Sequence, residues 1–138
     1  MTTDRNTVRW ESGDRARRAV LGDRYVDAAR VSEFSAPLQE LLTEYCWGGP
    51  WSRDGLPHQT RSLLNIAILG ALNRPRELAI HTKGALRNGC SEAEIAEVLL
   101  QMTVYAGVAA GVDAFHVVEG AIRDYRSDSE APAIADTE

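Results

Sequence analysis

The spacing of apolar residues constrains this chain most, because it follows the period of an α-helix from about residue 14 to residue 125. Leu38, Leu41, Leu42 and Tyr45 show this spacing clearly. No segment combines sustained two-residue alternation with β-branched residues, the pattern that indicates a strand. The sequence therefore predicts an all-α protein, and its 138 residues suit a single domain with one core.

Capping and helix-breaking residues divide this pattern into successive helices. Ser91 and Glu94 form a capping box, in which each side chain can bind the other residue's backbone amide. Gly89 and Gly107 are expected helix stops. The predicted helices span about residues 14–29 with a weak point at Gly22, 36–47 after Ser35 as N-cap, 57–72 with Pro57 in the first turn, 75–88 after Asn73 as N-cap, 91–105, and 109–125.

Two of these helices carry further expectations. The helix at 36–47 should pack by one face, and the helix at 57–72 is apolar on nearly every side, which predicts a central, buried position. We expect residues 13–126 to form the helical domain, with an N-terminal extension at 1–12. The segment 127–138 is acidic and lacks periodicity, so it is predicted to be a disordered tail.

Composition excludes several classes of partner. Hydrophobic residues make up 44% and charged residues 25% of the chain, as in ordinary globular domains. A net charge of −5 offers no basic surface for nucleic acid or an anionic membrane. The sequence has no signal-peptide pattern and no apolar run of the roughly 18 residues that a membrane span needs, so a cytoplasmic location is expected. Cys46 and Cys90 are then expected to be free thiols.

Glu77 and His81 form the most suggestive pair of titratable residues. They lie one helical turn apart, on a stripe that continues through Gly84 and Asn88. A carboxylate one turn before an imidazole is expected to orient the ring and raise its pKa, and Gly84 leaves room for a ligand or another backbone. The pair therefore indicates proton transfer near neutral pH. A purely structural contact at a helix edge is the alternative interpretation.

Other chemistries find less support. A metal site would need a third protein ligand, and neither His58 nor His116 forms an HxxxH or HExxH arrangement with the pair. No GxSxG, Walker or GxGxxG motif occurs, and Cys90 is more typical of a small apolar filler than of a nucleophile.

The segment "WGGPWSRDGLP" breaks regular structure but includes Trp47, Trp51 and Arg53, which a plain linker rarely carries. In the following helix, Arg61 and Asn65 lie one turn apart on a shared face, where a buried guanidinium or amide needs a partner. These five residues are candidates for a binding site.

Several segments together resemble the 4-carboxymuconolactone decarboxylase family, over about residues 15–120. They are "RRAVLGDRYVDAA", "EYCWGGPWSRDGL", "TRSLLNIAILGALNRPRELAIHTKGALRNG", "EIAEVLLQ" and "YAGVAAGVDAF". The resemblance implies the alkylhydroperoxidase-like fold, here a bundle of about six helices, assembled as a homo-oligomer such as a trimer or hexamer. It also implies a cofactor-independent enzyme of aromatic catabolism that converts 4-carboxymuconolactone to 3-oxoadipate enol-lactone and carbon dioxide.

The resemblance also suggests roles for the candidate residues. The redox branch of the superfamily has a CxxC motif followed four residues later by a histidine; here Arg74 and Glu77 replace the cysteines and His81 remains, which argues against thiol chemistry. Glu77 would orient His81, and His81 would donate or relay a proton to the dienolate formed as carbon dioxide leaves.

The remaining candidates would bind the substrate. Arg61 or Arg53 would hold a substrate carboxylate, with Asn65 beside them, and Trp47 and Trp51 would wall the pocket. The structural alternatives are that Arg61 pins two helices together and that the tryptophans anchor a subunit interface, with the "CWGGPW" segment partly buried against a neighbour.

Two positions depart from the family pattern. Ala109 stands where a proline is usual, and Val112 where an asparagine is expected. These departures leave open a diverged relative that acts on another lactone or on a β-keto acid in a biosynthetic pathway. A non-catalytic binding protein is a third possibility.

Overall fold

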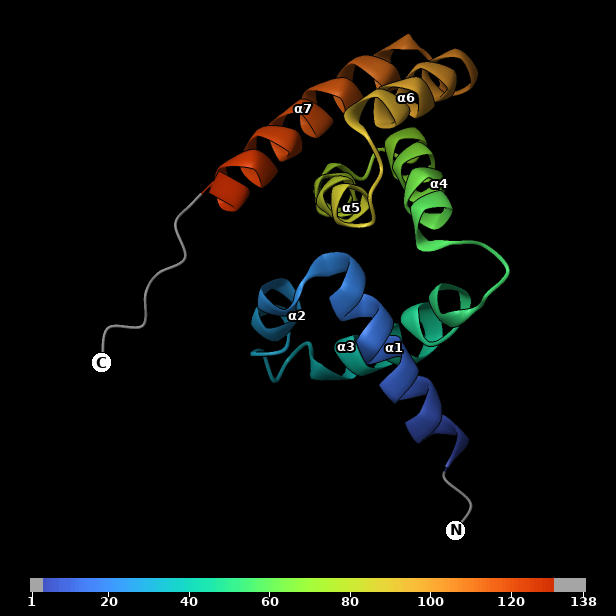
Figure 1. The fold of residues 1–138 in the computed structure, drawn as a ribbon, viewed down its shortest axis with the longest axis vertical. Helices are drawn as coiled ribbons and strands as arrows, with labels where there is room; N and C mark the ends of the chain where they lie inside the picture. The colour runs from blue at the N-terminus through green and yellow to red at the C-terminus, as the bar shows by residue number, and fades with distance from the viewer. Residues whose placement is uncertain (1–3, 131–138) are drawn as a thin grey trace, which may run out of the picture.

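The computed structural model describes residues 4–130 of the chain, and these are almost entirely helical (Figure 1). No strand occurs in that range, so the predicted all-α, single-domain class is confirmed. The elements in chain order are α1 (Arg5–Leu21), α2 (Asp23–Ala29), α3 (Ala36–Leu41), the π-helical turn η1 (Leu42–Trp47), the 3₁₀ turn η2 (Pro50–Ser52), α4 (His58–Ala71), α5 (Pro75–Arg87), α6 (Glu92–Ala106) and α7 (Val108–Glu130).

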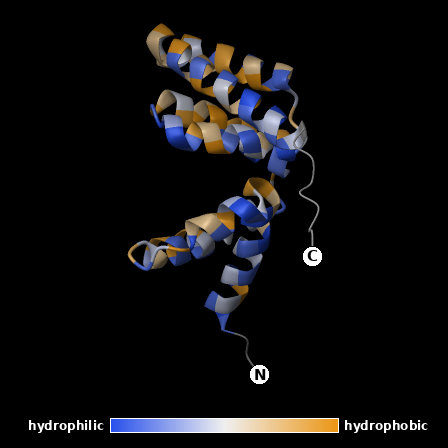
Figure 2. Cartoon of the chain, turned by 90° about the vertical axis from the view of Figure 1, so that its left-hand side faces the viewer, coloured by the Kyte–Doolittle hydropathy of each residue, from blue (hydrophilic) through white to orange (hydrophobic). Residues whose placement is uncertain are grey.

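The helices pack as two groups that meet at α5. One group contains α1, α2, α3, η1 and η2, and the other contains α4 to α7; Figure 2 shows the two groups one above the other. Each group has its own hydrophobic cluster. On α5, Leu78 and Ala85 belong to the cluster of the second group, whereas Ile80 packs against the cluster of the first. The α5 helix therefore joins the two clusters, and His81 lies on this helix.

Close backbone contacts fix α1 in the first group. A Cβ atom at Gly13 would lie 1.9 Å from the carbonyl oxygen of Thr43, so α1 and η1 approach each other more closely than any side chain permits. At the other end, Gly84 of α5 faces Val20 of α1, whose Cγ1 would lie 2.9 Å from an added Cβ. The room that the sequence predicted beside Gly84 is thus filled by Val20.

Most helix boundaries agree with the sequence signals. Gly22, Gly89 and Gly107 adopt positive φ angles of 85°, 89° and 111°, which glycine tolerates best, and each ends a helix. The predicted capping box is confirmed: the Ser91 hydroxyl accepts from the Glu94 amide and the Glu94 carboxylate accepts from the Ser91 amide, both at 3.0 Å. Gly22 is a complete break rather than a weak point, because α2 starts immediately after it.

Four predicted helix boundaries are wrong, three at helix starts and one at the end of the last helix. The first helix begins at Arg5, not near residue 14, because its early turns pack against η1 and Trp10 lies under the Arg30 guanidinium, 5.1 Å from its carbon to the ring centroid. Arg74, not Asn73, is the N-cap of α5, and Pro57 is the N-cap of α4 rather than in its first turn.

At the other end of the chain, α7 extends to Glu130, so residues 127–130 of the predicted tail are helical; the rest of that tail lies outside the described residues.

Two predicted apolar faces are not buried within the chain. On α3 and η1, Leu38, Leu41 and Tyr45 are exposed, and on α4 Ile68 is 51% exposed although the helix was expected to be buried on all sides. Figure 2 shows hydrophobic residues along the helices of the second group, and several of them, such as Val104 and Tyr105, are exposed. Within residues 4–130, no helix has the length and apolar character of a membrane span.

Candidate active site

His81 is buried where α5 meets the first group of helices. Only 8% of its surface is exposed. Its Nδ1 atom lies 3.4 Å from the Nδ2 of Asn65 on α4, a long hydrogen bond. Since an amide nitrogen only donates, Nδ1 acts as the acceptor and the ring proton resides on Nε2. Asn65 therefore sets the tautomer that presents an N–H group on the other side of the ring.

Two stacked tryptophans pack against the imidazole. The Trp47 ring lies nearly parallel to it, with 6.0 Å between centroids and 7° between planes, and the Trp51 ring follows at 6.1 Å and 24°. The tryptophans also stack on each other at 4.8 Å. Both are buried, so they wall the histidine within this chain and need no neighbouring subunit to cover them.

The loop after η1 is held in place by side-chain hydrogen bonds. The π-helical turn ends at Trp47, and the Ser52 hydroxyl donates to the Trp47 carbonyl at 2.6 Å. The Nε2 of His58 lies 2.9 Å from the Trp51 carbonyl and donates to it. These contacts fix both indole rings, so the wide turn and the loop place two large aromatic surfaces against α5.

Burial lowers the pKa of His81 to about 4. The imidazole is therefore neutral at pH 7, opposite to the predicted rise. Glu77 is exposed, and no hydrogen bond or ion pair joins it to His81 within residues 4–130. Its charge acts instead on Tyr25 and Cys46, whose pKa values are raised by burial and also by Glu77. The sequence pattern correctly placed the two residues one turn apart but did not show that only one is buried.

The candidate arginines take different positions. Arg61, one turn before Asn65, donates from Nη2 to the Arg53 carbonyl at 3.4 Å, and its buried Nε has no partner within residues 4–130. The Arg53 side chain is exposed and lines a cleft of about 650 Å³ together with Trp51 and His58. The structure thus brings together four of the predicted site residues: Trp47, Trp51, Asn65 and His81. Arg61 lies one turn before Asn65 on α4, and Arg53 lines the neighbouring cleft.

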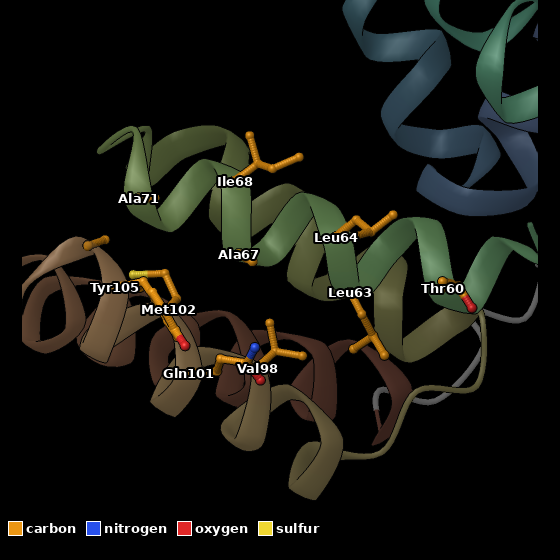
Figure 3. A pocket seen from close by; sticks show the side chains of 11 residues that line it. Thr60, Leu63, Leu64, Ala67, Ile68, Ala71, Val98, Gln101, Met102 and Tyr105 are labelled. Atoms are coloured by element: carbon orange, nitrogen blue, oxygen red, sulfur yellow. The ribbon is translucent and has the colours of Figure 1, made fainter.

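A second hollow lies away from His81. It occupies about 540 Å³ beside α4 and α6 and is lined mostly by apolar side chains. Figure 3 shows Leu63 of α4 and Met102 and Val98 of α6 between the two helices, with Leu64 and Ile68 on the outer side of α4. Its lining includes no histidine, arginine or carboxylate, so it offers no group for proton transfer. No cluster of three metal-binding side chains is found within residues 4–130.

Arg17 is a residue that sequence reasoning missed. It lies on α1, is only 3% exposed, and donates from Nη2 to the Oε1 of Gln39 at 2.7 Å. Its Nε and Nη1 are buried and have no partner among the described residues. In the sequence it stands in the run "DRARR", which looks like an ordinary solvated helix face. The one signal in the sequence for the burial of Arg17 was its spacing, since it lies one helical turn after Gly13 and one turn before Val20, which are both buried.

Comparison with known proteins agrees with this architecture. The model of the carboxymuconolactone decarboxylase family matches residues 36–120. The chain is 36% identical to 4-carboxymuconolactone decarboxylase of Acinetobacter baylyi, over 84% of this chain and 88% of that protein. It is 38% identical to the nitrosuccinic acid decarboxylase npaB of Metarhizium robertsii, over 83% and 82%. Both names describe decarboxylases, which is consistent with a carboxy-lyase, and the chain belongs to the carboxymuconolactone decarboxylase family.

Proposed function

We propose that this protein is a cofactor-independent decarboxylase of a small carboxylated acid, with 4-carboxymuconolactone as the first candidate substrate and 3-oxoadipate enol-lactone and carbon dioxide as products. The observation that carries the proposal is the neutral, buried His81 beside the stacked Trp47 and Trp51 rings, with its Nε2–H unused by Asn65. A donor in a buried, aromatic site is suited to stabilise negative charge that develops on a substrate.

The reaction needs an electron sink and a proton. When the ring carboxylate leaves as carbon dioxide, its bonding electron pair passes into the conjugated lactone carbonyl and forms a dienolate. A neutral imidazole with a lowered pKa can polarise such a carbonyl through its N–H. The dienolate's negative charge then raises the pKa of the ring, so that His81 can take a proton from solvent and pass it to the ring carbon next to the lactone carbonyl. The double bond thereby moves to the carbon that lost carbon dioxide, as the enol-lactone requires.

Glu77 remains part of this proposal in a changed role. It lies at the solvent-exposed start of α5, one turn before His81, and does not orient the ring. Catalytic hydrogen bonds are often loose before a substrate binds. We assign Glu77 the delivery of a proton from solvent toward His81 and Asn65 the positioning of the ring, while Arg61 and Arg53 are candidates for substrate contact.

A second substrate class is favoured by one of the relatives. The Metarhizium protein is named for nitrosuccinic acid, in which a nitro group takes the place of the lactone carbonyl as electron sink. Both substrate names describe molecules with two acid groups and one strongly electron-withdrawing group. A diverged specificity for such an acid would agree with the departures at Ala109 and Val112, and it would place the enzyme in biosynthesis rather than aromatic catabolism.

One assay tests the proposal. The purified protein is incubated separately with 4-carboxymuconolactone and with nitrosuccinate, while released carbon dioxide and lactone absorbance are recorded. Release from either acid that depends on His81 is expected. Absence of release from both acids, in a preparation that is folded, would rule out this function.

A further inference from the structure

Arg17 is a buried charged group that the proposed reaction does not use. An arginine guanidinium remains charged at any physiological pH and offers five N–H groups. Here one nitrogen is bound to neutral Gln39, and two more are buried without a partner within residues 4–130. A buried charge of this kind normally has a carboxylate beside it.

The nearby carboxylate on the same helix is already occupied. Asp14 binds Arg18 at 3.2 Å and Arg30 at 2.5 Å. Arg30 also donates to Thr43. These two arginines satisfy Asp14, and Arg17 has no ion pair among the described residues. Its guanidinium is therefore prepared for an anion that the chain itself does not supply.

The position of Arg17 connects it to the site. On α1 it comes one turn before Val20, which packs on Gly84 of α5 and whose carbonyl accepts a hydrogen bond from Arg87 at 3.2 Å. One turn before Gly84 on α5 are Ile80 and His81. Ile80 packs in the same hydrophobic cluster as Val20, so these turns of α1 and α5 are neighbours.

Trp47 provides a second link. It belongs to the hydrophobic cluster that includes Ala16 and Val20, which flank Arg17 on α1, and its ring lies 6.0 Å from the His81 ring. Cys46, next to Trp47, lies close enough to Arg17 that each side chain affects the pKa of the other. Arg17 is thus in the shell of side chains around the tryptophan that walls His81.

We propose that Arg17 binds the carboxylate that the substrate keeps, and that the protein thereby selects small acids with two carboxylates. This inference rests on the proposed decarboxylase function and extends it to specificity. An arginine on the departing carboxylate would stabilise the charge that must disappear, and so would favour the bound substrate over the transition state. An arginine on the other carboxylate holds the molecule through charge-assisted hydrogen bonds without opposing the reaction.

The kinetic test pairs a protein change with a substrate change. Arg17→Met removes the guanidinium at similar length, and Arg9→Met, at an exposed position of the same helix, is the control. With 4-carboxymuconolactone or nitrosuccinate, Arg17→Met should lower kcat/KM about 30- to 300-fold, mostly through KM. With the same acid esterified at the carboxylate that is kept, wild type and variant should be equally slow. Loss of kcat/KM by the same factor on both substrates would show a structural role and overturn the proposal.

A binding test separates this inference from the proposed function. Succinate, which carries two carboxylates, should raise the Tm of the wild-type protein and of Arg9→Met but not of Arg17→Met, whereas butyrate, with one, should raise none of them. This readout needs no turnover, so an Arg17-dependent effect of succinate supports the anchor even if no carbon dioxide is ever released. Equal Tm shifts in all three proteins would overturn it.

Two further measurements cover other outcomes. If Arg17→Met fails to fold, titration of the wild-type protein with succinate should move the Arg17 Nε–H resonance in NMR spectra, and an unmoved resonance contradicts the proposal. If Arg17→Met changes the mass of the particle in light scattering and both carboxylate-dependent effects are absent, the unpaired N–H groups serve a neighbouring copy of the chain instead.

Discussion

The protonation state of His81 determines what its variants should do. Because burial keeps the ring neutral at pH 7, the residue can act first as a hydrogen-bond donor and only later as a proton carrier. Asn65 contributes by holding Nδ1 as the acceptor, so its role is to position the ring. The sequence did not show this division of roles, because it predicted Asn65 as a substrate contact and Glu77 as the residue that orients the ring.

His81→Ala and His81→Gln are expected to lower kcat by about 10²–10⁴-fold, the range for loss of general acid–base catalysis. The glutamine retains an N–H donor but cannot carry a proton. His81→Gln should therefore have a higher kcat than His81→Ala only if polarisation of the carbonyl limits the rate. His116→Ala, at an exposed position of α7, is the matched control and should keep full activity. Near-normal activity of both His81 variants would assign the proton to another residue.

Stability should depend on pH through the same residue. The pKa of His81 is about 4 when folded, against an ordinary value of 6.5, so the unfolded chain binds more protons between these pH values. The contribution of this group is fully present above pH 6.5 and declines as the pH falls toward 4, by about 3 kcal/mol in total. Denaturant unfolding at several pH values should show this decline in wild type, and His81→Gln should lack it.

Helix boundaries show which local signals are sufficient. The capping box at Ser91 and the glycines at 89 and 107 act within one turn, so they could be read directly from the sequence. The start of α1 could not, because its early turns carry no apolar stripe and are stabilised by η1, which is distant in sequence. The π-helical turn was missed for a similar reason, since it continues the spacing of an ordinary helix up to Trp47.

The contact between α1 and η1 can be tested at Gly13. An added methyl group would meet the Thr43 carbonyl oxygen at 1.9 Å, and backbone cannot yield as a side chain can. Gly13→Ala should therefore lower the free energy of unfolding by about 2–4 kcal/mol, despite the better helix propensity of alanine.

Gly120→Ala is the matched control for this change. Gly120 is also inside a helix, and the nearest atom to an added Cβ is 3.8 Å away, at the end of the flexible Arg123 side chain. This variant should be more stable by about 0.5–1 kcal/mol, the usual gain in a helix interior. Equal effects of the two changes in chemical denaturation would mean that α1 and η1 do not approach as closely as described.

Residues 4–130 leave a large apolar surface exposed. Tyr105 is 86% exposed, and the hollow between α4 and α6 is open along Leu64 and Ile68 (Figure 3). Surfaces of this kind are typical of subunit interfaces. Assembly was expected from the sequence by way of the "CWGGPW" loop, but both tryptophans are already buried within the chain, so we now expect α4 and α6 to form the interface.

Light scattering should show a particle larger than one chain at micromolar concentration. Ile68→Glu places a charge in the α4–α6 hollow and should shift the population toward the monomer. Glu97→Lys also changes a charge on α6 but lies outside the lining of the hollow, so it should leave the particle mass unchanged. A monomeric wild-type protein would contradict this prediction.

The arrangement of two groups around α5 separates two tasks that enzymes often combine. The residue proposed to move the proton, His81, comes with the second group, whereas Arg17, Trp47 and Trp51, which shape the space beside it, all come from the first. Under the proposed roles, substitutions in the first group would change which acid binds while His81 stays unchanged. A family built in this way would acquire new substrates by changing one half of its chain while keeping its chemistry.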